Sequence, residues 1–347
     1  MIDRLILKAR AMGCSDMHIT VGMPLMFRIN GKLQIIPDAP NDAETEAMLL
    51  EMLDEKQRKK IEESIDLDFA IKSSDGNRQR VNIFKQEGNL AATIRLLNSD
   101  IPSLQMLGLP NVLSELADRP RGLILVTGPT GSGKSTTLAA MIDHINSTRP
   151  EHIITIEDPI EYKYQRKMSL IHQREVGRDV GDFAAALRSA LREDPDIILV
   201  GEMRDYETIS AALTAAETGH LVMSTLHTTG AAQTIDRIID ACPASIQNQI
   251  RTQLAGVLNG VITQCLVPNA KGTGRLAATE ILVGTDAVCN LIRENKCHQM
   301  NSLMQSGYNV GMHTLNSDLS RLVNSGMITM ENAIRYSNDP AELEQYF

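Results

Sequence analysis

Residues 128–136 constrain this chain more than any other segment, because they fit the pattern G-x-x-x-x-G-K-[ST]. The preceding residues, 121–127, form an apolar run typical of a buried parallel strand, and 136–146 have the apolar spacing of a helix. Glycines in such a turn let backbone N–H groups close around an anion, and the helix N-terminus adds partial positive charge. We therefore predict a phosphate-binding loop that holds a nucleoside triphosphate.

Each part of this loop has an expected contact with the nucleotide. Lys134 is predicted to reach the β- and γ-phosphates of ATP, and the hydroxyl of Ser135 is predicted to bind Mg²⁺. Backbone N–H groups and short side chains are expected to surround the phosphates. The predicted nucleotide-binding residues are Gly128, Thr130, Gly131, Ser132, Gly133, Lys134, Ser135 and Thr136.

The residue pattern before this loop differs from the pattern around it, and 347 residues are enough for two domains. Residues 1–97 predict a small α+β domain with an antiparallel sheet. In it, Asn30-Gly31 is expected to be a hairpin turn, and 41–64 are expected to form one helix with a capping box at its start. Residues 98–120 are interrupted by prolines and predict a linker.

From residue 121 onward, apolar strands alternate with helices, which predicts an α/β domain with a parallel sheet over 121–347. Its last part, 285–347, is expected to consist of short helices. The predicted fold class is therefore α/β, with an N-terminal α+β domain followed by a P-loop domain and a helical C-terminal region.

Composition narrows the function classes. The formal net charge is −9 and no long basic run occurs, which argues against a broad nucleic-acid-binding face. Five cysteines without a C-x-x-C pair argue against disulfides and against a zinc site. The N-terminus lacks the apolar core of a signal peptide, and no apolar run approaches the roughly 20 residues of a membrane span. We expect a cytoplasmic protein that reaches a membrane only through partners.

Acidic and polar side chains follow the predicted inner strands. In an open parallel sheet, ligands bind beyond the carboxyl ends of the strands. Phosphoryl transfer requires Mg²⁺, a carboxylate that orients water, and positive charge for the transition state. The side chains concerned are Glu157, Asp158 and Glu161 after strand 152–156, Glu202 after 196–200, and His227 after 220–226.

Two of these carboxylates are candidates for metal coordination and water activation, and the residues alone do not assign the two roles uniquely. We favour Glu161 for the water and Glu202 for the metal, through its water shell. His227 is a candidate sensor of the γ-phosphate or donor to it. The alternatives are structural: Glu202 could pair with Arg204, and His227 could be a core histidine.

Arginines on the N-terminal strands form a second group of candidates. Arg80 and Arg95 lie in largely apolar surroundings, and Arg78 is nearby. They would either form a solvated sheet face with modest ion pairs or complete a nucleotide site as arginine fingers. If the site belongs to a neighbouring copy, the second reading requires a ring.

With these motifs placed, the chain resembles the secretion-ATPase superfamily, and within it the type IV pilus retraction, or twitching-motility, ATPases. Four blocks carry the resemblance: 128–136 (Walker A), 155–161 (Asp box), 191–205 (Walker B) and 217–231 (His box). Residues 15–19 also resemble the family's N-terminal S-D-[LM]-H-[ILV] signature. The likeness extends over nearly all of the chain.

This resemblance implies a cytoplasmic homo-hexamer at the inner face of the membrane, built from PAS-like and RecA-like domains. It implies that Arg80 and Arg95 help to complete the ATP site and that His220 and His227 are the histidines of the His box. Hydrolysis would move the two domains about the linker and drive pilus retraction. The implied partners are an inner-membrane platform protein and, in some systems, a second retraction ATPase.

One stretch departs from the family pattern. Retraction motors carry a signature near A-I-R-N-L-I-R-E, whereas residues 287–294 read A-V-C-N-L-I-R-E, with Cys289 in place of an arginine. The extension motors of the superfamily usually have a longer N-terminal region and a tetracysteine site. Neither is found here, which favours the retraction branch.

Three other functions remain open from sequence alone. The chain could be a pilus assembly or accessory motor or a type II secretion ATPase. It could also be a nucleotide-gated scaffold without productive turnover. A nucleic-acid translocase is disfavoured by the acidic balance.

Overall fold

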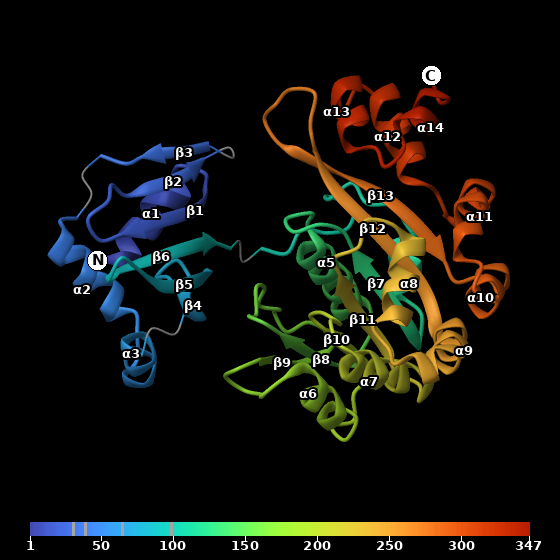
Figure 1. Ribbon diagram of the computed structural model, residues 1–347, viewed down its shortest axis with the longest axis horizontal. Helices are drawn as coiled ribbons and strands as arrows, with labels where there is room; N and C mark the ends of the chain where they lie inside the picture. Colours follow the sequence, from blue (N-terminus) through green and yellow to red (C-terminus); the bar gives the residue numbers. More distant parts are fainter. Residues whose placement is uncertain (30–31, 38–39, 64–65, 98–99) are drawn as a thin grey trace. The chain divides into compact units, whose positions relative to one another are not determined.

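The computed structural model describes residues 1–29, 32–37, 40–63, 66–97 and 100–347 (Figure 1). The chain divides into two compact units. The first unit comprises Met1–Asp100 and the short segment Pro159–Lys163, and the second comprises Ile101–Asp158 and Tyr164–Phe347. Each unit contains its own β-sheet and its own apolar core.

The first unit is built on a six-stranded antiparallel sheet in the order β3-β2-β1-β6-β5-β4. Side chains alternate along β5: Val81 and Ile83 are fully buried, whereas Arg80 and Asn82 are partly exposed. The sheet therefore has one apolar face and one polar face. The elements are α1 (Ile2–Ala11), β1 (Cys14–Thr20), β2 (Met26–Ile29), β3 (Lys32–Ile35), α2 (Asp42–Glu51), α3 (Glu55–Glu62), β4 (Leu67–Lys72), β5 (Arg78–Gln86) and β6 (Asn89–Leu96).

Two local predictions for this unit have different outcomes. The Asn30-Gly31 turn lies outside the described residues, but the flanking strands pair with Ile29 opposite Lys32, as a two-residue hairpin requires. The prediction of one helix over 41–64 is wrong, because α2 and α3 are separate helices. Asp54 starts the second helix with a capping box: its side chain accepts from the Gln57 N–H, and the Gln57 side chain accepts from the Asp54 N–H.

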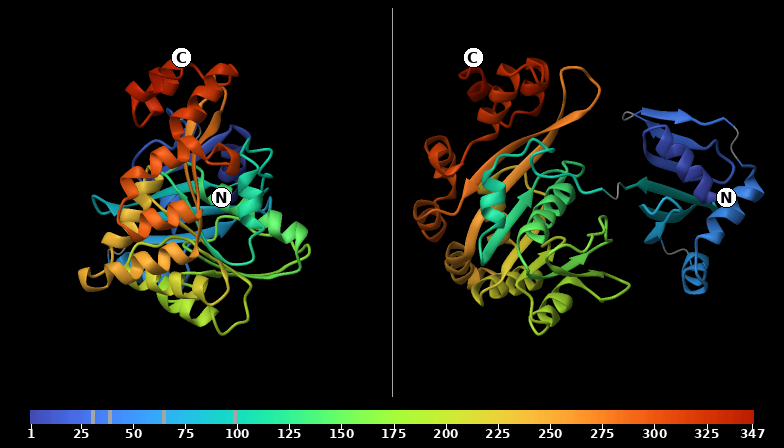
Figure 2. Two further views of the ribbon diagram at one scale, coloured as in Figure 1. Left: turned by 90° about the vertical axis from the view of Figure 1, so that its right-hand side faces the viewer. Right: turned by 180° about the vertical axis from the view of Figure 1, so that it is seen from behind.

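The second unit is built on a seven-stranded sheet in the order β13-β12-β7-β11-β10-β8-β9 (Figure 2). All neighbours are parallel except the β12–β13 pair, which confirms the predicted parallel sheet. Its strands are β7 (Gly122–Thr127), β8 (His152–Glu157), β9 (Leu170–Glu175), β10 (Ile197–Val200), β11 (Leu221–Leu226), β12 (Leu258–Pro268) and β13 (Arg275–Val283).

The helices of this unit include one that the sequence analysis did not identify, α8, whose buried residues Ile235, Ile238 and Ile239 have helical spacing. The edge strand β9 was also not identified, because its alternation is largely polar. The helices are α4 (Val112–Ala117), α5 (Lys134–Thr148), α6 (Phe183–Ala190), α7 (Tyr206–Glu217), α8 (Ala231–Asp240), α9 (Gln247–Val257), α10 (Asp286–Arg293), α11 (Met300–Ser306), α12 (Leu315–Asn324), α13 (Met330–Tyr336) and α14 (Pro340–Glu344).

Residues 101–120, which the sequence analysis assigns to a linker, belong to the second unit. The reason is apolar burial: Val112, Leu113 and Leu116 of α4 all lie in the main core of this unit. At the far end of the β12–β13 hairpin, α12, α13 and α14 enclose a separate small core that includes Val267 and Leu319 (Figure 1). In the described parts of the chain, no helix combines the length and apolarity needed to cross a membrane.

Candidate nucleotide site

The predicted phosphate-binding loop connects the end of β7 to the start of α5, at the carboxyl edge of the parallel sheet. All three of its glycines have positive φ, with +138° at Gly128, +79° at Gly131 and +92° at Gly133. The N–H of Ser132 donates to the carbonyl of Pro129 at 3.2 Å, which closes the turn. Thr130 and Ser135 are exposed, whereas Ser132 is buried.

Lys134 is buried at the start of α5 and its ammonium group lies within the turn. Its Nζ donates to the carbonyl oxygens of Gly128 at 2.8 Å and Pro129 at 3.1 Å. The same Nζ is 3.5 Å from Nδ1 of His227, the residue that follows β11. The predicted lysine and histidine are therefore neighbours across two adjacent strands.

Glu202 extends this group of side chains by one more strand, since it follows β10. Its Oε2 lies 3.5 Å from Nε2 of His227, and its Oε1 lies 2.7 Å from Nε of Arg204. The Glu202 side chain is 18% exposed and that of Arg204 is 73% exposed, so the arginine pair is screened by water and holds Glu202 only weakly. Lys134, His227 and Glu202 thus form one continuous cluster.

A cavity of about 250 Å³ lies beside this cluster, with Glu202, Thr225, His227 and Arg237 in its lining. Thr225 fixes part of its wall, because its hydroxyl donates to the carbonyl of Gly201 at 2.6 Å. The cavity adjoins polar and charged side chains of two strand ends, which suits a polar ligand.

Gln264 on β12 supports the phosphate-binding loop and was not predicted from the sequence. Its side chain is 2% exposed. Its amide nitrogen donates to the carbonyl of Ser132 at 2.6 Å, and its amide oxygen accepts from the hydroxyl of Thr137 at 2.8 Å. One side chain therefore joins the loop to the first turn of α5. The residue lies 132 positions after Ser132, so no local motif reveals it.

The carboxylates after β8 are arranged differently from those after β10. Glu157 accepts hydrogen bonds from the hydroxyl of Thr155 at 2.6 Å and from the Gln173 amide at 3.2 Å, so it stabilises the sheet edge. Glu161 lies in the segment Pro159–Lys163, which belongs to the first unit. The geometry of the second unit therefore includes Glu202 but not Glu161.

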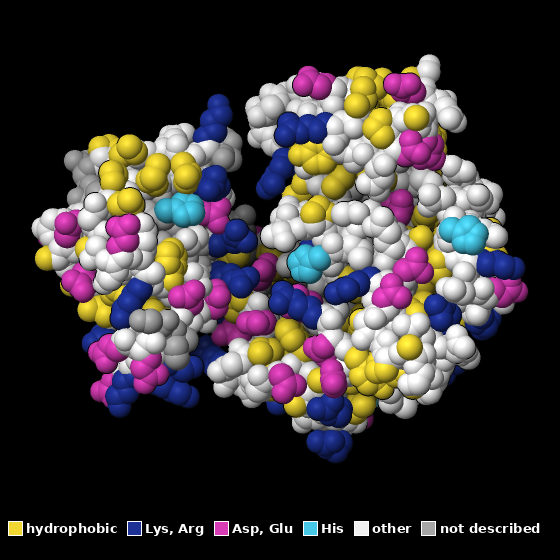
Figure 3. All heavy atoms as spheres, viewed as in Figure 1, with side chains coloured by type: hydrophobic (Ala, Val, Ile, Leu, Met, Phe, Trp, Pro, Cys, Tyr) yellow, Lys and Arg dark blue, Asp and Glu magenta, His cyan; other side chains and the backbone are white. Residues whose placement is uncertain are grey.

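The predicted arginines lie side by side on the polar face of the first unit. Arg80 on β5 is directly opposite Arg95 on β6. Arg95 Nε lies 2.9 Å from Asp16 Oδ1, and Arg80 Nε lies 3.5 Å from Asp68 Oδ1. The Arg80 side chain is 37% exposed and the Arg95 side chain is 54% exposed, so both guanidinium groups remain accessible to water. On the face drawn in Figure 3, basic and acidic side chains are interspersed over each unit.

Asp16 is the carboxylate that holds Arg95, and it is only 8% exposed. Burial alone would raise its pKa, but hydrogen bonds from Arg95 and Ser15 outweigh burial and lower the pKa of Asp16 below its usual value. The charged form is therefore favoured in the folded protein. Its stabilising effect is present above the unfolded pKa and is lost as the pH falls through the folded pKa.

We expect Asp16→Asn to lower the free energy of unfolding by about 1 kcal/mol near pH 7, because the accessible arginine loses a charged partner. The difference from the wild type should shrink as the pH falls through the lowered pKa of Asp16, where the carboxylate itself becomes protonated. Urea unfolding at neutral pH and over a descending series of acidic pH values measures this. Asp68→Asn, which removes the longer and more exposed pair to Arg80, should have a smaller effect. An Asp16→Asn effect that does not depend on pH would contradict this account.

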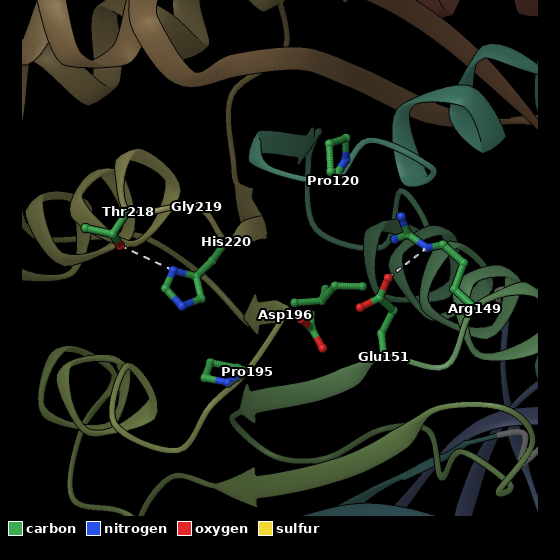
Figure 4. Close-up of a pocket in the computed structure, with 9 residues that line it drawn as sticks. Pro120, Arg149, Glu151, Pro195, Asp196, Thr218, Gly219 and His220 are labelled. Atoms are coloured by element: carbon green, nitrogen blue, oxygen red, sulfur yellow. Dashed lines mark hydrogen bonds and ion pairs between the residues drawn. The ribbon is translucent and has the colours of Figure 1, made fainter.

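His220 is not part of the cluster around Lys134. It directly precedes β11, whereas His227 directly follows it, so the two histidines lie at opposite edges of the sheet. Figure 4 shows His220 in a second cavity of about 250 Å³, with Arg149, Glu151 and Asp196. Its Nδ1 donates to the carbonyl of Ala215 at 2.9 Å. Burial, together with the nearby Asp196 carboxylate, raises the pKa of Glu151.

The fold and this site together define a class of protein. A glycine turn between a buried strand and a helix, with a buried lysine and a neighbouring carboxylate at the carboxyl edge of a parallel sheet, is the arrangement of a P-loop ATPase. The family model described as Type II/IV secretion system protein matches residues 1–341, and the chain belongs to this family.

Individual relatives agree with this assignment. A type IV pilus retraction ATPase, PilT, of Pseudomonas aeruginosa is 50% identical over 96% of this chain and 96% of its own length. A twitching motility protein of Neisseria gonorrhoeae is 50% identical over 89% of this chain and 83% of its own length. A crystal structure of the pilus retraction motor PilT with bound ADP superposes with a TM-score of 0.91 at 49% identity and covers 99% of both chains. The chain is an ATPase with the two-domain fold of these motors.

Proposed function

We propose that this chain is an ATP-hydrolysing motor that powers the retraction of type IV pili. The observation that carries the proposal is the 50% identity to a retraction ATPase over 96% of both chains. The contacts of Lys134 with His227 and of His227 with Glu202 support it, because they gather at the phosphate-binding loop the groups that phosphoryl transfer needs.

In this proposal the phosphate-binding loop, residues 128–136, holds ATP through its backbone N–H groups and Lys134. Mg²⁺ suits the oxygen donors at this edge, the exposed hydroxyl of Ser135 and the carboxylate of Glu202. Among the described residues, no cluster of His, Cys, Asp or Glu side chains could hold a metal ion alone. That fits Mg²⁺, which keeps several waters and binds through one or two protein ligands and the phosphates of the nucleotide.

The remaining roles concern water and transition-state charge. Glu161 would orient the attacking water, Glu202 would bind the metal through its water shell, and His227 would donate to the γ-phosphate. Arg80 and Arg95 would supply positive charge as phosphoryl transfer proceeds. Their exposure on the polar face of the first unit supports this role, since an accessible guanidinium can bind phosphate.

We further propose a homo-hexameric ring at the inner face of the cytoplasmic membrane. The ring would contact the membrane only through partners, with an inner-membrane platform protein and, in some cells, a second retraction ATPase. No role for nucleic acid is proposed. Cys289, which replaces an arginine of the retraction signature, is half-buried against the main core on α10. A neutral thiol suits that position, because burial raises the pKa of Cys289.

Gene deletion with imaging of labelled pili tests the retraction role. We expect pili that extend but no longer retract, with rescue by the wild-type gene and no rescue by Lys134→Ala. Complete loss of pili would instead indicate an assembly motor, and rescue by Lys134→Ala would exclude an ATP-driven role. A nucleic-acid translocase would be indicated by ATPase activity that DNA stimulates in the purified protein.

A further inference from the structure

Glu280 on β13 is a buried carboxylate with two helix N-termini as its partners. It is 7% exposed. The N–H of Ala231, the first residue of α8, donates to its Oε1 at 2.7 Å. The backbone N–H of Leu315, the first residue of α12, faces the same carboxylate and favours its charged form. Burial raises the pKa of Glu280, and these two donors oppose the rise.

The contact with α8 supplies a cap that the helix itself lacks. Its N-cap residue is Gly230, which has no side chain to accept from the first N–H groups. A carboxylate at this position also interacts favourably with the positive end of the helix dipole. The start of α8 is therefore held by Glu280, and α8 begins four residues after His227.

A second hydrogen bond joins the same loop to the C-terminal helices. Asn338, between α13 and α14, donates from its side chain to the carbonyl of Thr229 at 3.0 Å. Asn316 of α12 fixes the chain that carries Asn338: its amide donates to the Asp339 carbonyl at 2.9 Å and accepts from the Ser337 hydroxyl at 2.7 Å. The loop after His227 is thus linked to the C-terminal helices directly through Asn338 and indirectly through Glu280 of β13.

The strand that carries Glu280, β13, is paired with β12, which is attached to the phosphate-binding loop. Glu280 is paired in register with Thr263 of β12, and the Thr263 hydroxyl lies 2.9 Å from the hydroxyl of Thr127, the last residue of β7. The next residue, Gln264, holds the loop itself. One β-hairpin therefore contacts the phosphate-binding loop, the loop after His227, and α12.

We propose that Glu280 is a positioning residue that couples α12–α14 to the loop between β11 and α8, which carries His227. Asn338 is the second link. This inference rests on the proposed ATPase site. When nucleotide moves His227, the start of α8 moves with it, and the shared carboxylate transmits the shift to the start of α12. Conversely, the C-terminal helices hold His227 in the position required for turnover.

Glu280→Gln tests this coupling with little change in volume. An amide offers one acceptor oxygen and turns an N–H donor toward the other helix, so one of the two helices loses its acceptor. We expect kcat to fall on the order of 10- to 100-fold with the KM for ATP unchanged, since small displacements of a catalytic group have effects of this size. Glu331→Gln on the exposed surface of α13 is the matched control and should leave kcat unchanged.

Hydrogen–deuterium exchange of the full-length protein separates coupling from a purely structural role. ADP or a non-hydrolysable ATP analogue should slow exchange in residues 128–140 and alter it in 311–324 of the wild type. In Glu280→Gln, residues 128–140 should still respond to nucleotide, whereas residues 311–324 should no longer respond. Asn338→Ala, on the exposed surface, should weaken the response of residues 311–324 to nucleotide. It serves as the test variant if Glu280→Gln does not fold.

Two outcomes would overturn the inference. In one, residues 128–140 respond to nucleotide but 311–324 do not respond in the wild type. In the other, the response of 311–324 persists unchanged in both variants. By contrast, an absent response at 128–140 in the wild type would remove the nucleotide site and with it the proposed function.

Discussion

Glu202→Gln is expected to abolish ATP hydrolysis while leaving ATP binding largely intact. The substitution removes the negative charge beside His227, at 3.5 Å, but preserves the volume of the side chain. Loss of one electrostatic contribution at such a site costs at least about 100-fold in turnover, roughly 2.7 kcal/mol. Steady-state phosphate release measures turnover, and equilibrium binding of a fluorescent ATP analogue measures affinity.

Glu193→Gln is the matched control for this experiment. Glu193, which follows α6, forms an ion pair with Arg174 of β9 at 2.7 Å, the same length as the pair between Glu202 and Arg204. The Glu193→Gln variant should hydrolyse ATP at nearly the wild-type rate. Wild-type turnover no greater than that of Glu202→Gln would favour a nucleotide-gated scaffold over a motor.

Glu161→Gln distinguishes the two proposed carboxylate roles. If Glu202 holds Mg²⁺ through its water shell, raising the Mg²⁺ concentration should partly restore the Glu202→Gln variant. If Glu161 orients water, the same titration should not restore Glu161→Gln. Restoration of Glu161→Gln alone would reverse the assignment.

The parts of this site that could be predicted are those in which local sequence decides the structure. The turn before Lys134 requires glycines at particular backbone angles, and parallel strands must place Glu202 and His227 at one edge. Gln264 and Glu280 could not be found in this way. Each acts on a partner far away in the chain, 132 and 49 residues respectively, and neither has a motif of its own.

The errors in the fold also have local physical causes. Residues on both sides of 52–54 are good helix formers, and for this reason the sequence predicts one continuous helix. In the structure, residues 52–54 separate α2 from α3. The signal that was available is the pairing of Asp54 with Gln57 as a second capping box. β9 was missed because an edge strand buries few of its side chains and so lacks an apolar run.

Gly128→Ala is expected to disrupt the phosphate-binding loop more severely than any other glycine substitution in that loop. Gly128 has φ of +138°, and an added Cβ would lie 2.2 Å from the carbonyl oxygen of Gln264 and 2.6 Å from the Ser132 hydroxyl. Neither neighbour can withdraw easily, because one is backbone of β12 and the other is buried. Backbone strain and the steric clash together should cost about 2–5 kcal/mol.

Two control substitutions separate the effect of backbone strain at positive φ from the effect of the steric clash of the added Cβ. Gly131 and Gly272 also have positive φ, but an added Cβ would meet no atom within 4 Å at either position. Alanine at Gly272, in the turn between β12 and β13, should cost about 1 kcal/mol of stability and leave ADP affinity unchanged. Thermal unfolding with and without ADP measures both quantities. If Gly128→Ala retained wild-type ADP affinity, the close approach of β12 to the loop would not be what shapes the phosphate site.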